Sequence, residues 1–146
     1  MNLSSIAKKK NLGWFFFKYY NEKNDRGKIG IIEYNKDISF NVKRVFFISD
    51  VPNNKERGLH SHKSLKQVLV CIRGSLKIEL ENGQKKKTYT LKHNNKALFV
   101  DGKVWRRMFN FSKDCLLLVL CDREYSKDKV IRDYKTFKKY ALKEFK

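Results

Sequence analysis

The sequence has few of the residues that mark secreted, membrane-spanning or disordered chains. It contains one proline, and its three cysteines, Cys71, Cys115 and Cys121, are odd in number and form no CxxC pair. All three lie inside apolar runs, which predicts buried thiols in a reducing compartment. The longest uninterrupted apolar run near the start, Trp14 to Phe17, is too short for a signal-peptide core or a membrane span. We therefore expect a cytoplasmic protein with no membrane partner.

Acidic residues are scarce as well. There are 15 of them against 34 lysines and arginines, so the formal net charge is +19. A basic surface can bind nucleic acid through phosphates, but here the basic residues are mostly lysines, scattered from Lys8 to Lys146. Lysine is the less selective phosphate binder, so nucleic acid is not expected as a partner. The charge still favours the capture of anionic small molecules such as nucleotides.

The chain is predicted to be a single domain, residues 1–146, in which 1–11 form a loose lead-in. Its length and its 41% of hydrophobic residues suit one core. Short apolar or alternating runs with no helix between them are typical of a β-sandwich or barrel, of which the jelly roll is one form. Strands are expected at residues 12–20, 29–34, 42–48, 67–72, 75–80, 87–91, 97–100, 107–111 and 116–121.

Two local signals complete the predicted fold. Asn82-Gly83 is typical of a two-residue hairpin turn. Helical spacing of apolar residues from Ile131 to Lys143 predicts an amphipathic C-terminal helix that lies across the barrel.

Two histidines carry the strongest chemical signal. Residues two apart on a strand point the same way, so His60 and His62 place two imidazoles on one face. With Gln67 and Gly74 after them, they resemble the first motif of the cupin superfamily, His-x-His-x(3,4)-Glu-x(6)-Gly. In that motif the two His and the Glu bind metal, whereas in this sequence Gln67 stands in the place of the Glu.

The second cupin motif, which ends in His-x(3)-Asn, is altered too. Its counterpart ends in Arg106 and Asn110, with the arginine in the place of the histidine. A guanidinium is protonated at any ordinary pH and cannot bind a cation. Two imidazoles opposite an arginine instead suit an anionic or carbonyl substrate, with histidine as the base. We expect no bound metal; the alternative is that His60 and His62 form a structural or metal-binding pair.

Motifs from about residue 24 to 140 resemble, in order, those of the dTDP-sugar 3,4-ketoisomerase family, the WxcM-like cupins. The segments that carry this resemblance are Asp25-Arg26-Gly27, Lys43-Arg44-Val45-Phe46-Phe47, Arg57 to Lys63, Gln67 to Cys71, Val104-Trp105, and Asp133-Tyr134 to Tyr140. The resemblance implies an all-β cupin jelly roll that forms a homodimer, often with N-terminal strands exchanged between subunits, and needs no cofactor.

The same resemblance implies a reaction. Such enzymes convert dTDP-4-keto-6-deoxy-D-glucose to a 3-keto isomer, ahead of an aminotransferase that makes a 3-amino-3,6-dideoxy sugar for a surface glycan. By this resemblance His60 is the base for the C3 proton, and His62 orients the sugar or relays a proton. Because the dTDP diphosphate carries about two negative charges, basic and polar side chains are expected around it. The candidates are Arg44, Arg57, Lys63, Gln67, Arg106 and Arg26.

Each of these binding candidates has a structural alternative as a solvated charge or a strand-edge polar group, and Arg26 could instead hold a structural carboxylate. One departure from the family matters more. Many members have a tyrosine in the aromatic pair after Arg-Val, but this chain has Phe46 and Phe47, which cannot move a proton. His62, a tyrosine such as Tyr34, or a water would then be the second proton carrier, or turnover would be slower.

Two other functions compete with the isomerase. A non-catalytic sugar-nucleotide-binding cupin is the alternative that the missing tyrosine favours, and a metal-dependent dioxygenase is the third. Arg106 stands at a family position tied to the C4 epimer, and its fixed charge is expected to hold the enediolate. The sequence leaves open whether the product is the gluco or the galacto 3-keto sugar.

Overall fold

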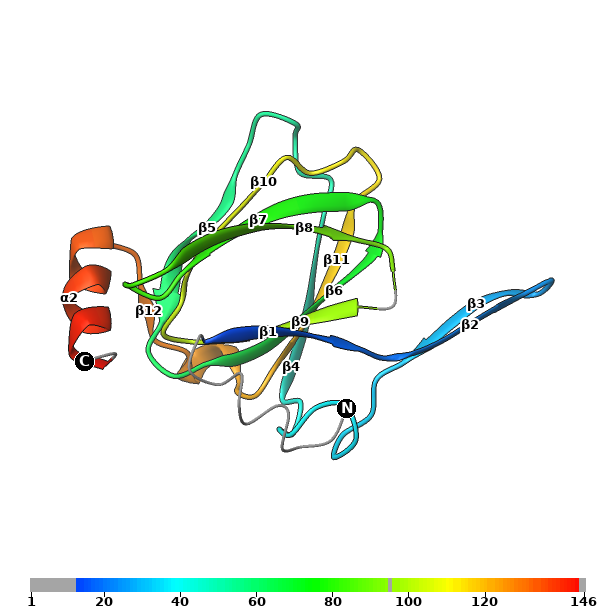
Figure 1. Ribbon diagram of the computed structural model, residues 1–146, viewed down its shortest axis with the longest axis horizontal. Coiled ribbons are helices and arrows are strands. Elements are labelled where there is room, and N and C mark those ends of the chain that lie inside the picture. The colour runs from blue at the N-terminus through cyan, green and yellow to red at the C-terminus, as the bar shows by residue number, and fades with distance from the viewer. Residues whose placement is uncertain (1–12, 95, 145–146) are drawn as a thin grey trace.

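The computed structural model describes residues 13–94 and 96–144, which form two five-stranded sheets, a two-stranded hairpin and a C-terminal helix (Figure 1). The first sheet has the order β1 (Trp14–Lys18), β9 (Lys96–Asp101), β6 (Lys66–Arg73), β11 (Leu116–Cys121) and β4 (Arg44–Ser49). The second has the order β12 (Val130–Ile131), β5 (Arg57–His62), β10 (Trp105–Phe109), β7 (Ser75–Glu81) and β8 (Lys86–Lys92). The predicted lead-in at residues 1–11 lies outside the described residues.

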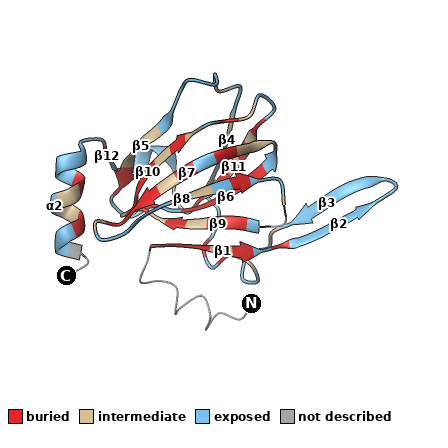
Figure 2. Cartoon of the chain, turned by 45° about the horizontal axis from the view of Figure 1, so that its top comes forward, coloured by how far each residue is buried: buried red, intermediate tan, exposed pale blue. Residues whose placement is uncertain are grey.

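Every pairing within the two sheets is antiparallel, and most neighbouring strands are distant in the sequence. The predicted all-β sandwich with a C-terminal helix is therefore confirmed. Hairpin β2 (Tyr20–Asn24) and β3 (Gly27–Ile31) extends away from the sandwich and is exposed along its whole length (Figure 2).

The main core lies between the two sheets. Side chains two apart on a strand point to the same face, so alternate residues of each strand enter the core. On β7, for example, Leu76, Ile78 and Leu80 are at most 1% exposed, whereas Lys77 between them faces solvent. Cys71, Cys115 and Cys121 are buried and free, as predicted.

The outer face of the first sheet is only partly covered. Its covered half is a second apolar cluster of strand and loop residues, which includes Phe15, Phe17, Val68, Val70, Ile38 and Phe40. The edge strand β4 lies beyond this cluster, and its Val45 and Phe47 are 55% and 68% exposed. An edge strand with exposed apolar side chains is a surface that proteins usually cover.

The C-terminal helix α2 runs over Tyr134–Glu144 and packs Phe137 and Ala141 against Trp105 of β10. The prediction that the helix begins at Ile131 is wrong. Asp133 caps it, because its Oδ2 accepts the Thr136 backbone N–H at 2.8 Å. Ile131 belongs instead to β12, where it pairs with β5 yet still packs against the helix.

The other predicted strands are present, with shifted ends. The strand expected at 29–34 runs from Gly27 to Ile31, and the one expected at 107–111 runs from Trp105 to Phe109. The latter strand ends before Asn110, whose φ of 56° is left-handed. The hairpin after β7 turns one residue later than predicted. Asn82 N–H donates to the Lys85 carbonyl at 3.1 Å, and Asn82 Oδ1 accepts two backbone N–H groups of the turn.

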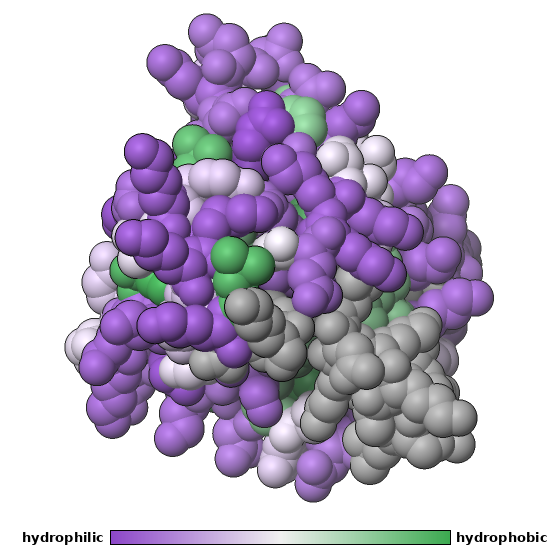
Figure 3. Space-filling view, turned by 60° about the vertical axis from the view of Figure 1, so that its left-hand side comes forward, coloured by the Kyte–Doolittle hydropathy of each residue, from purple (hydrophilic) through white to green (hydrophobic). Residues whose placement is uncertain are grey.

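The face of the molecule on the side of α2 is largely hydrophilic, with small apolar groups between the polar side chains (Figure 3). On the helix itself, Lys135, Lys139 and Lys143 are exposed. No helix within residues 13–94 and 96–144 is long and apolar enough to cross a membrane.

Candidate active site

A cavity of about 310 Å³ opens between the two sheets. Its apolar wall comes from Phe46, Ile48, Leu69, Met108 and Val119, and its polar lining is Arg44, Arg57, His60, His62, Gln67, Arg106, Tyr125, Asp128 and Arg132. Six of the eight predicted site residues are therefore brought together in one place: Arg44, Arg57, His60, His62, Gln67 and Arg106.

Strand β5 carries the two histidines into this cavity. The strand has an extra residue at Leu59 relative to β10, because Arg106 pairs with His60 while Arg107 pairs with Gly58. Gly58 and Leu59 have φ of 88° and 58°, and a Cβ on Gly58 would lie 2.8 Å from the Arg106 carbonyl oxygen. Glycine is thus needed where β5 bends, and the bend sets His60 beside Arg106.

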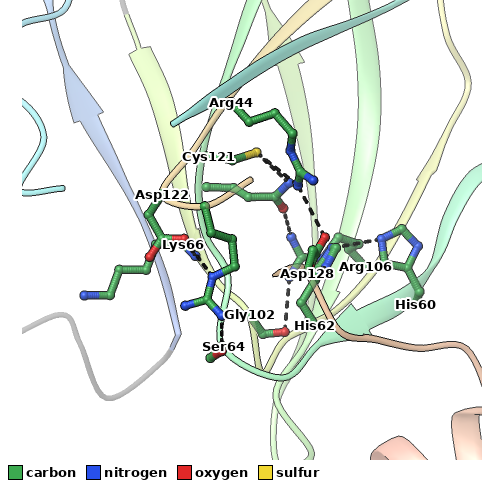
Figure 4. Close-up of polar contacts among 12 residues, drawn as sticks. Arg44, His60, His62, Ser64, Lys66, Gly102, Arg106, Cys121, Asp122 and Asp128 are labelled. Atoms are coloured by element: carbon green, nitrogen blue, oxygen red, sulfur yellow. Dashed lines mark hydrogen bonds and ion pairs between the residues drawn. The ribbon is translucent and has the colours of Figure 1, made fainter. Parts of the chain in front are cut away.

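The two imidazoles contact each other. Their Nε2 atoms are 3.0 Å apart, and the rings cross at 85° (Figure 4). His62 Nδ1 lies 2.8 Å from Asp128 Oδ1, and the other carboxylate oxygen of Asp128 lies 3.3 Å from Arg44 Nη2. Asp128, on the segment between the 3₁₀ turn η2 (Tyr125–Lys127) and β12, thus joins the histidine pair to an arginine.

Arg106 is a buried cation at the inner end of the cavity. Its Nη1 donates to Gln67 Oε1, and its Nη2 donates to the carbonyls of Val104 at 3.0 Å and Asp101 at 3.1 Å. In the described part of the chain no carboxylate forms an ion pair with this guanidinium. Burial lowers the pKa of Arg106 to about 10, so the group is still charged at neutral pH.

The protonation of both histidines follows from these surroundings. Burial and then the charge of Arg106 lower the pKa of His60 to about 4. The same two causes lower the pKa of His62, while the Asp128 carboxylate acts in the opposite direction. Both imidazoles are therefore neutral near pH 7 and available as bases.

Arg44, on β4, has spare donors. Its Nη2 contacts Asp128 and the Cys121 thiol, and its guanidinium lies 5.5 Å from the ring centre of Tyr125 and 5.7 Å from that of Phe46. Nε and Nη1 are buried with no hydrogen-bond partner among the described residues. Buried donors without partners are costly, so they indicate a site for an anionic ligand.

Three predicted residues lie outside the cavity. Lys63 follows His62 but is exposed, Arg26 is exposed in the turn of hairpin β2–β3, and Tyr34 is 52% exposed on the segment after the hairpin. Of the aromatic pair, Phe46 lines the cavity and Phe47 faces away from it.

Three polar residues of the cavity lining were not predicted: Tyr125, Asp128 and Arg132. They lie in a polar, lysine-containing segment that carries no motif. The one available signal is position, since this segment directly follows β11, whose last residue Cys121 contacts Arg44 and Gln67.

The described residues do not fit a metal centre. Gln67 and Arg106 take the places of two cupin ligands, and they hydrogen-bond to each other. Among residues 13–94 and 96–144, no group of three or more His, Cys, Asp or Glu side chains has an arrangement that could hold an ion.

Comparisons with known proteins agree with this architecture. The family model described as FdtA: WxcM-like, C-terminal matches residues 13–142. A TDP-4-oxo-6-deoxy-alpha-D-glucose-3,4-oxoisomerase of Aneurinibacillus thermoaerophilus is 42% identical over 118 residues, which are 81% of this chain and 85% of the relative.

Solved structures resemble the chain over nearly its whole length. A mutant of the 3,4-ketoisomerase QdtA from Thermoanaerobacterium thermosaccharolyticum, in complex with TDP-4-keto-6-deoxyglucose, has a TM-score of 0.87 at 36% identity, and the match covers 91% of this chain and 96% of that one. A 3,4-ketoisomerase from Helicobacter canadensis has a TM-score of 0.84 at 34% identity, and the match covers 90% of this chain and 98% of that one.

Proposed function

The chain belongs to the FdtA family of WxcM-like dTDP-sugar 3,4-ketoisomerases, and we propose that it converts TDP-4-keto-6-deoxyglucose to a TDP-3-keto-6-deoxyhexose. The observation that carries this proposal is a neutral histidine pair that faces a buried guanidinium inside one cavity. This arrangement offers a base beside a fixed positive charge, which is what a proton transfer next to a ketone requires.

The proposed chemistry needs a base and a donor. The 4-ketone acidifies the hydrogen on C3, and neutral His60 removes it to give an enediol-like intermediate. A proton passes between the two oxygens, and C4 is then reprotonated. We assign the relay to His62, because its Nε2 is 3.0 Å from that of His60, whereas Tyr34 lies outside the cavity.

Two arginines have distinct proposed roles. Arg106 holds the negative charge of the enediolate, since its own charge is buried in a medium where such interactions are strong. Arg44 binds the diphosphate through its unpartnered Nε and Nη1, with Arg57 at the cavity rim and Gln67 near the sugar or nucleotide. The negative charges of the bound substrate also oppose the effect of Arg106 on the histidines, so they raise the pKa of the base.

We also propose a homodimer. Apolar side chains are exposed along β4 and hairpin β2–β3, among them Val45, Phe47, Ile29 and Ile31. A two-stranded hairpin is marginally stable by itself, and β4 is a sheet edge. Exchange of the hairpin between two subunits would cover these residues and carry Arg26 toward a partner's cavity. Lys63 stays exposed and contributes to attraction of the anionic substrate.

The pathway and the compartment are part of the proposal. The 3-keto product would be the substrate of an aminotransferase that makes a 3-amino-3,6-dideoxy sugar for a surface glycan. Free cysteines at three buried positions suit the cytoplasm. The face on which C4 is reprotonated decides between the gluco and galacto products, and coupling to aminotransferases specific for each epimer would identify it.

A non-catalytic binding protein is the second candidate, because the aromatic pair in which the family resemblance implies a tyrosine is Phe46 and Phe47 in this chain, and Phe46 lines the cavity. Incubation with TDP-4-keto-6-deoxyglucose in D₂O separates the two. The isomerase incorporates deuterium into the hexose and forms a 3-keto sugar. Tight TDP binding with no incorporation would identify a binding protein.

A further inference from the structure

We infer that Asp128 is a positioning residue whose carboxylate fixes the tautomer of His62, so that His60, His62 and Asp128 take up the substrate proton as one unit. This inference rests on the proposed isomerase function for its role in turnover. The structural part, the tautomer of His62, holds for the protein without substrate.

The contact between Asp128 and His62 determines where one proton lies. Asp128 Oδ1 is 2.8 Å from His62 Nδ1, and both side chains are only 6% exposed. A carboxylate can only accept a hydrogen bond, so the proton of neutral His62 is on Nδ1. The lone pair of His62 is therefore on Nε2, the atom that faces His60.

The second contact leaves room for one more proton. The two Nε2 atoms are 3.0 Å apart, and a hydrogen bond between them needs one proton that only His60 can supply. His60 Nδ1 is buried with no hydrogen-bond partner among the described residues. Two neutral imidazoles carry two N–H protons on four ring nitrogens. One of these protons is on His62 Nδ1, and the other is the His60 proton between the two Nε2 atoms. A third proton completes the pair, with one N–H on each Nδ1 and one shared between the Nε2 atoms.

The proposed proton transfer is balanced in this chain. The C3–H bond breaks, its electron pair stays on the substrate as the enediolate, and the proton goes to Nδ1 of His60, which holds the one free lone pair of the neutral histidine pair. The proton between the two Nε2 atoms stays shared, so the positive charge is spread over both rings. The pair then carries one positive charge, and the Asp128 carboxylate carries the matching negative charge. Return of the proton to C4 restores the neutral pair.

Asp128 is suited to this role because of the other charges around the pair. The other charged and titratable groups that line the cavity with the histidines are Arg44 from β4, Arg57 from β5, Arg106 from β10, and Tyr125, Asp128 and Arg132 from the segment after β11. Within the described residues, Asp128 is the one carboxylate that raises the pKa of both histidines, and Arg106 lowers both. Without Asp128, a protonated pair would face the buried Arg106 with no counter-charge.

The same carboxylate also links two parts of the site. Its Oδ2 lies 3.3 Å from Nη2 of Arg44, the proposed diphosphate ligand. Loss of the Asp128 charge would therefore affect the reaction and, more weakly, the binding of the diphosphate by Arg44. Separate measurements of kcat and of TDP affinity distinguish these two effects.

The test uses the full chain and the Asp128→Asn variant. The asparagine can turn its amide toward His62 Nδ1 and accept from Arg44 with its oxygen, which would move the His62 proton from Nδ1 to Nε2. We expect kcat to fall about 100-fold, with the TDP dissociation constant changed less than about threefold. In ¹⁵N NMR the wild type shows His62 protonated on Nδ1, and the variant shows it on Nε2.

Glu124→Gln is the matched control, because it removes one negative charge from an exposed position on the same segment. It should keep the wild-type kcat and the wild-type His62 tautomer. An Asp128→Asn protein with unchanged kcat and unchanged tautomer would overturn the inference. If the variant does not fold, the wild-type spectrum decides, since His62 protonated on Nε2 would overturn it alone.

The outcomes also separate this inference from the proposed function. A wild-type protein that does not convert TDP-4-keto-6-deoxyglucose would end the isomerase proposal and the role of Asp128 in turnover, while His62 protonated on Nδ1 would still support the structural part. If the wild type is active and the Asp128→Asn variant has the same kcat, the inference alone would end and the isomerase proposal would stand.

Discussion

A single buried cation, Arg106, dominates the electrostatics of the cavity. Its guanidinium donates to Gln67 and to backbone carbonyls, and in the described residues it has no carboxylate in ion-pair contact. A buried charge without a counter-ion is costly, and such cost is often found at sites that bind an oppositely charged group. The developing enediolate would supply that charge.

Replacement of Arg106 should change the titration of the pair. In Arg106→Gln, removal of the neighbouring charge should raise the pKa of His60 from about 4 toward its ordinary value of 6.5. NMR titration of the ligand-free protein measures this shift. The acidic limb of kcat/KM should move to higher pH in the same direction, with a lower plateau. Arg107→Gln, on the same strand but paired with Glu56, is the control and should leave the titration of His60 unchanged, and an equal shift in both variants would contradict the account.

Residue patterns predicted the centre of the site better than its periphery. Gln67 and Arg106 were recognised because they occupy defined places in a motif. Lys63 was chosen as a basic residue for the diphosphate, but it directly follows His62, and alternation along the chain turns adjacent side chains to opposite sides. No sequence pattern marked Asp128 as a site residue, since a carboxylate that points into a cavity from a polar segment has the same sequence pattern as one exposed to solvent.

At the scale of elements, the bend in β5 positions the base. Gly58 adopts φ 88° directly against the Arg106 backbone, and the extra residue after it rotates the strand so that both histidines enter the cavity. The site therefore depends on backbone conformation as well as on its side chains.

Gly58→Ala tests this dependence. The added Cβ would lie 2.8 Å from the Arg106 carbonyl oxygen, so the strand must move, at a cost of about 1–3 kcal/mol. We expect a lower unfolding free energy in urea and at least a tenfold loss of kcat. Gly27→Ala is matched, since Gly27 also has a left-handed φ of 113°, but a Cβ added there would meet no atom within 4 Å. Comparable losses of kcat in both variants would argue against a specific role for the bend.

The secondary-structure elements were predictable where their patterns are long. Alternation of polar and apolar residues identified β7, and a short apolar run identified β11, both with nearly correct ends. It missed β12, whose two residues are too few to show a period. Ile131 was assigned to the helix because of its helical spacing from Tyr134 and Phe137. In the structure it packs against the same helix from a strand, so spacing alone could not separate the two cases.

At the scale of the whole molecule, exposed apolar surface predicts association. Phe47 is 68% exposed on edge strand β4, and hairpin β2–β3 is exposed along its whole length. Phe47→Asp should convert the proposed dimer to monomer in sedimentation velocity, because a buried carboxylate in the interface is costly. Thr90→Asp, on the exposed edge strand β8 of the other sheet, should not. A wild-type monomer, or a Phe47→Asp dimer of unchanged stability, would contradict this interface.

Fold and family were both predictable from the sequence, since the spaced motifs that carry the resemblance also carry the barrel's turns and strands. The predicted membership of the WxcM-like family is confirmed. The homodimer was expected from the family resemblance alone, because single exposed apolar residues in a sequence do not show which face of a sheet they share.

The central claim is that His60 removes a proton from the sugar. Its most direct test is deuterium incorporation from D₂O into TDP-4-keto-6-deoxyglucose by the wild type, by His60→Asn and by His93→Asn, which alters an exposed histidine. Wild type and His93→Asn should incorporate deuterium and form the 3-keto sugar at similar rates. His60→Asn should fold and bind TDP but exchange at least about 10²-fold more slowly. Near-normal exchange by His60→Asn would contradict the account.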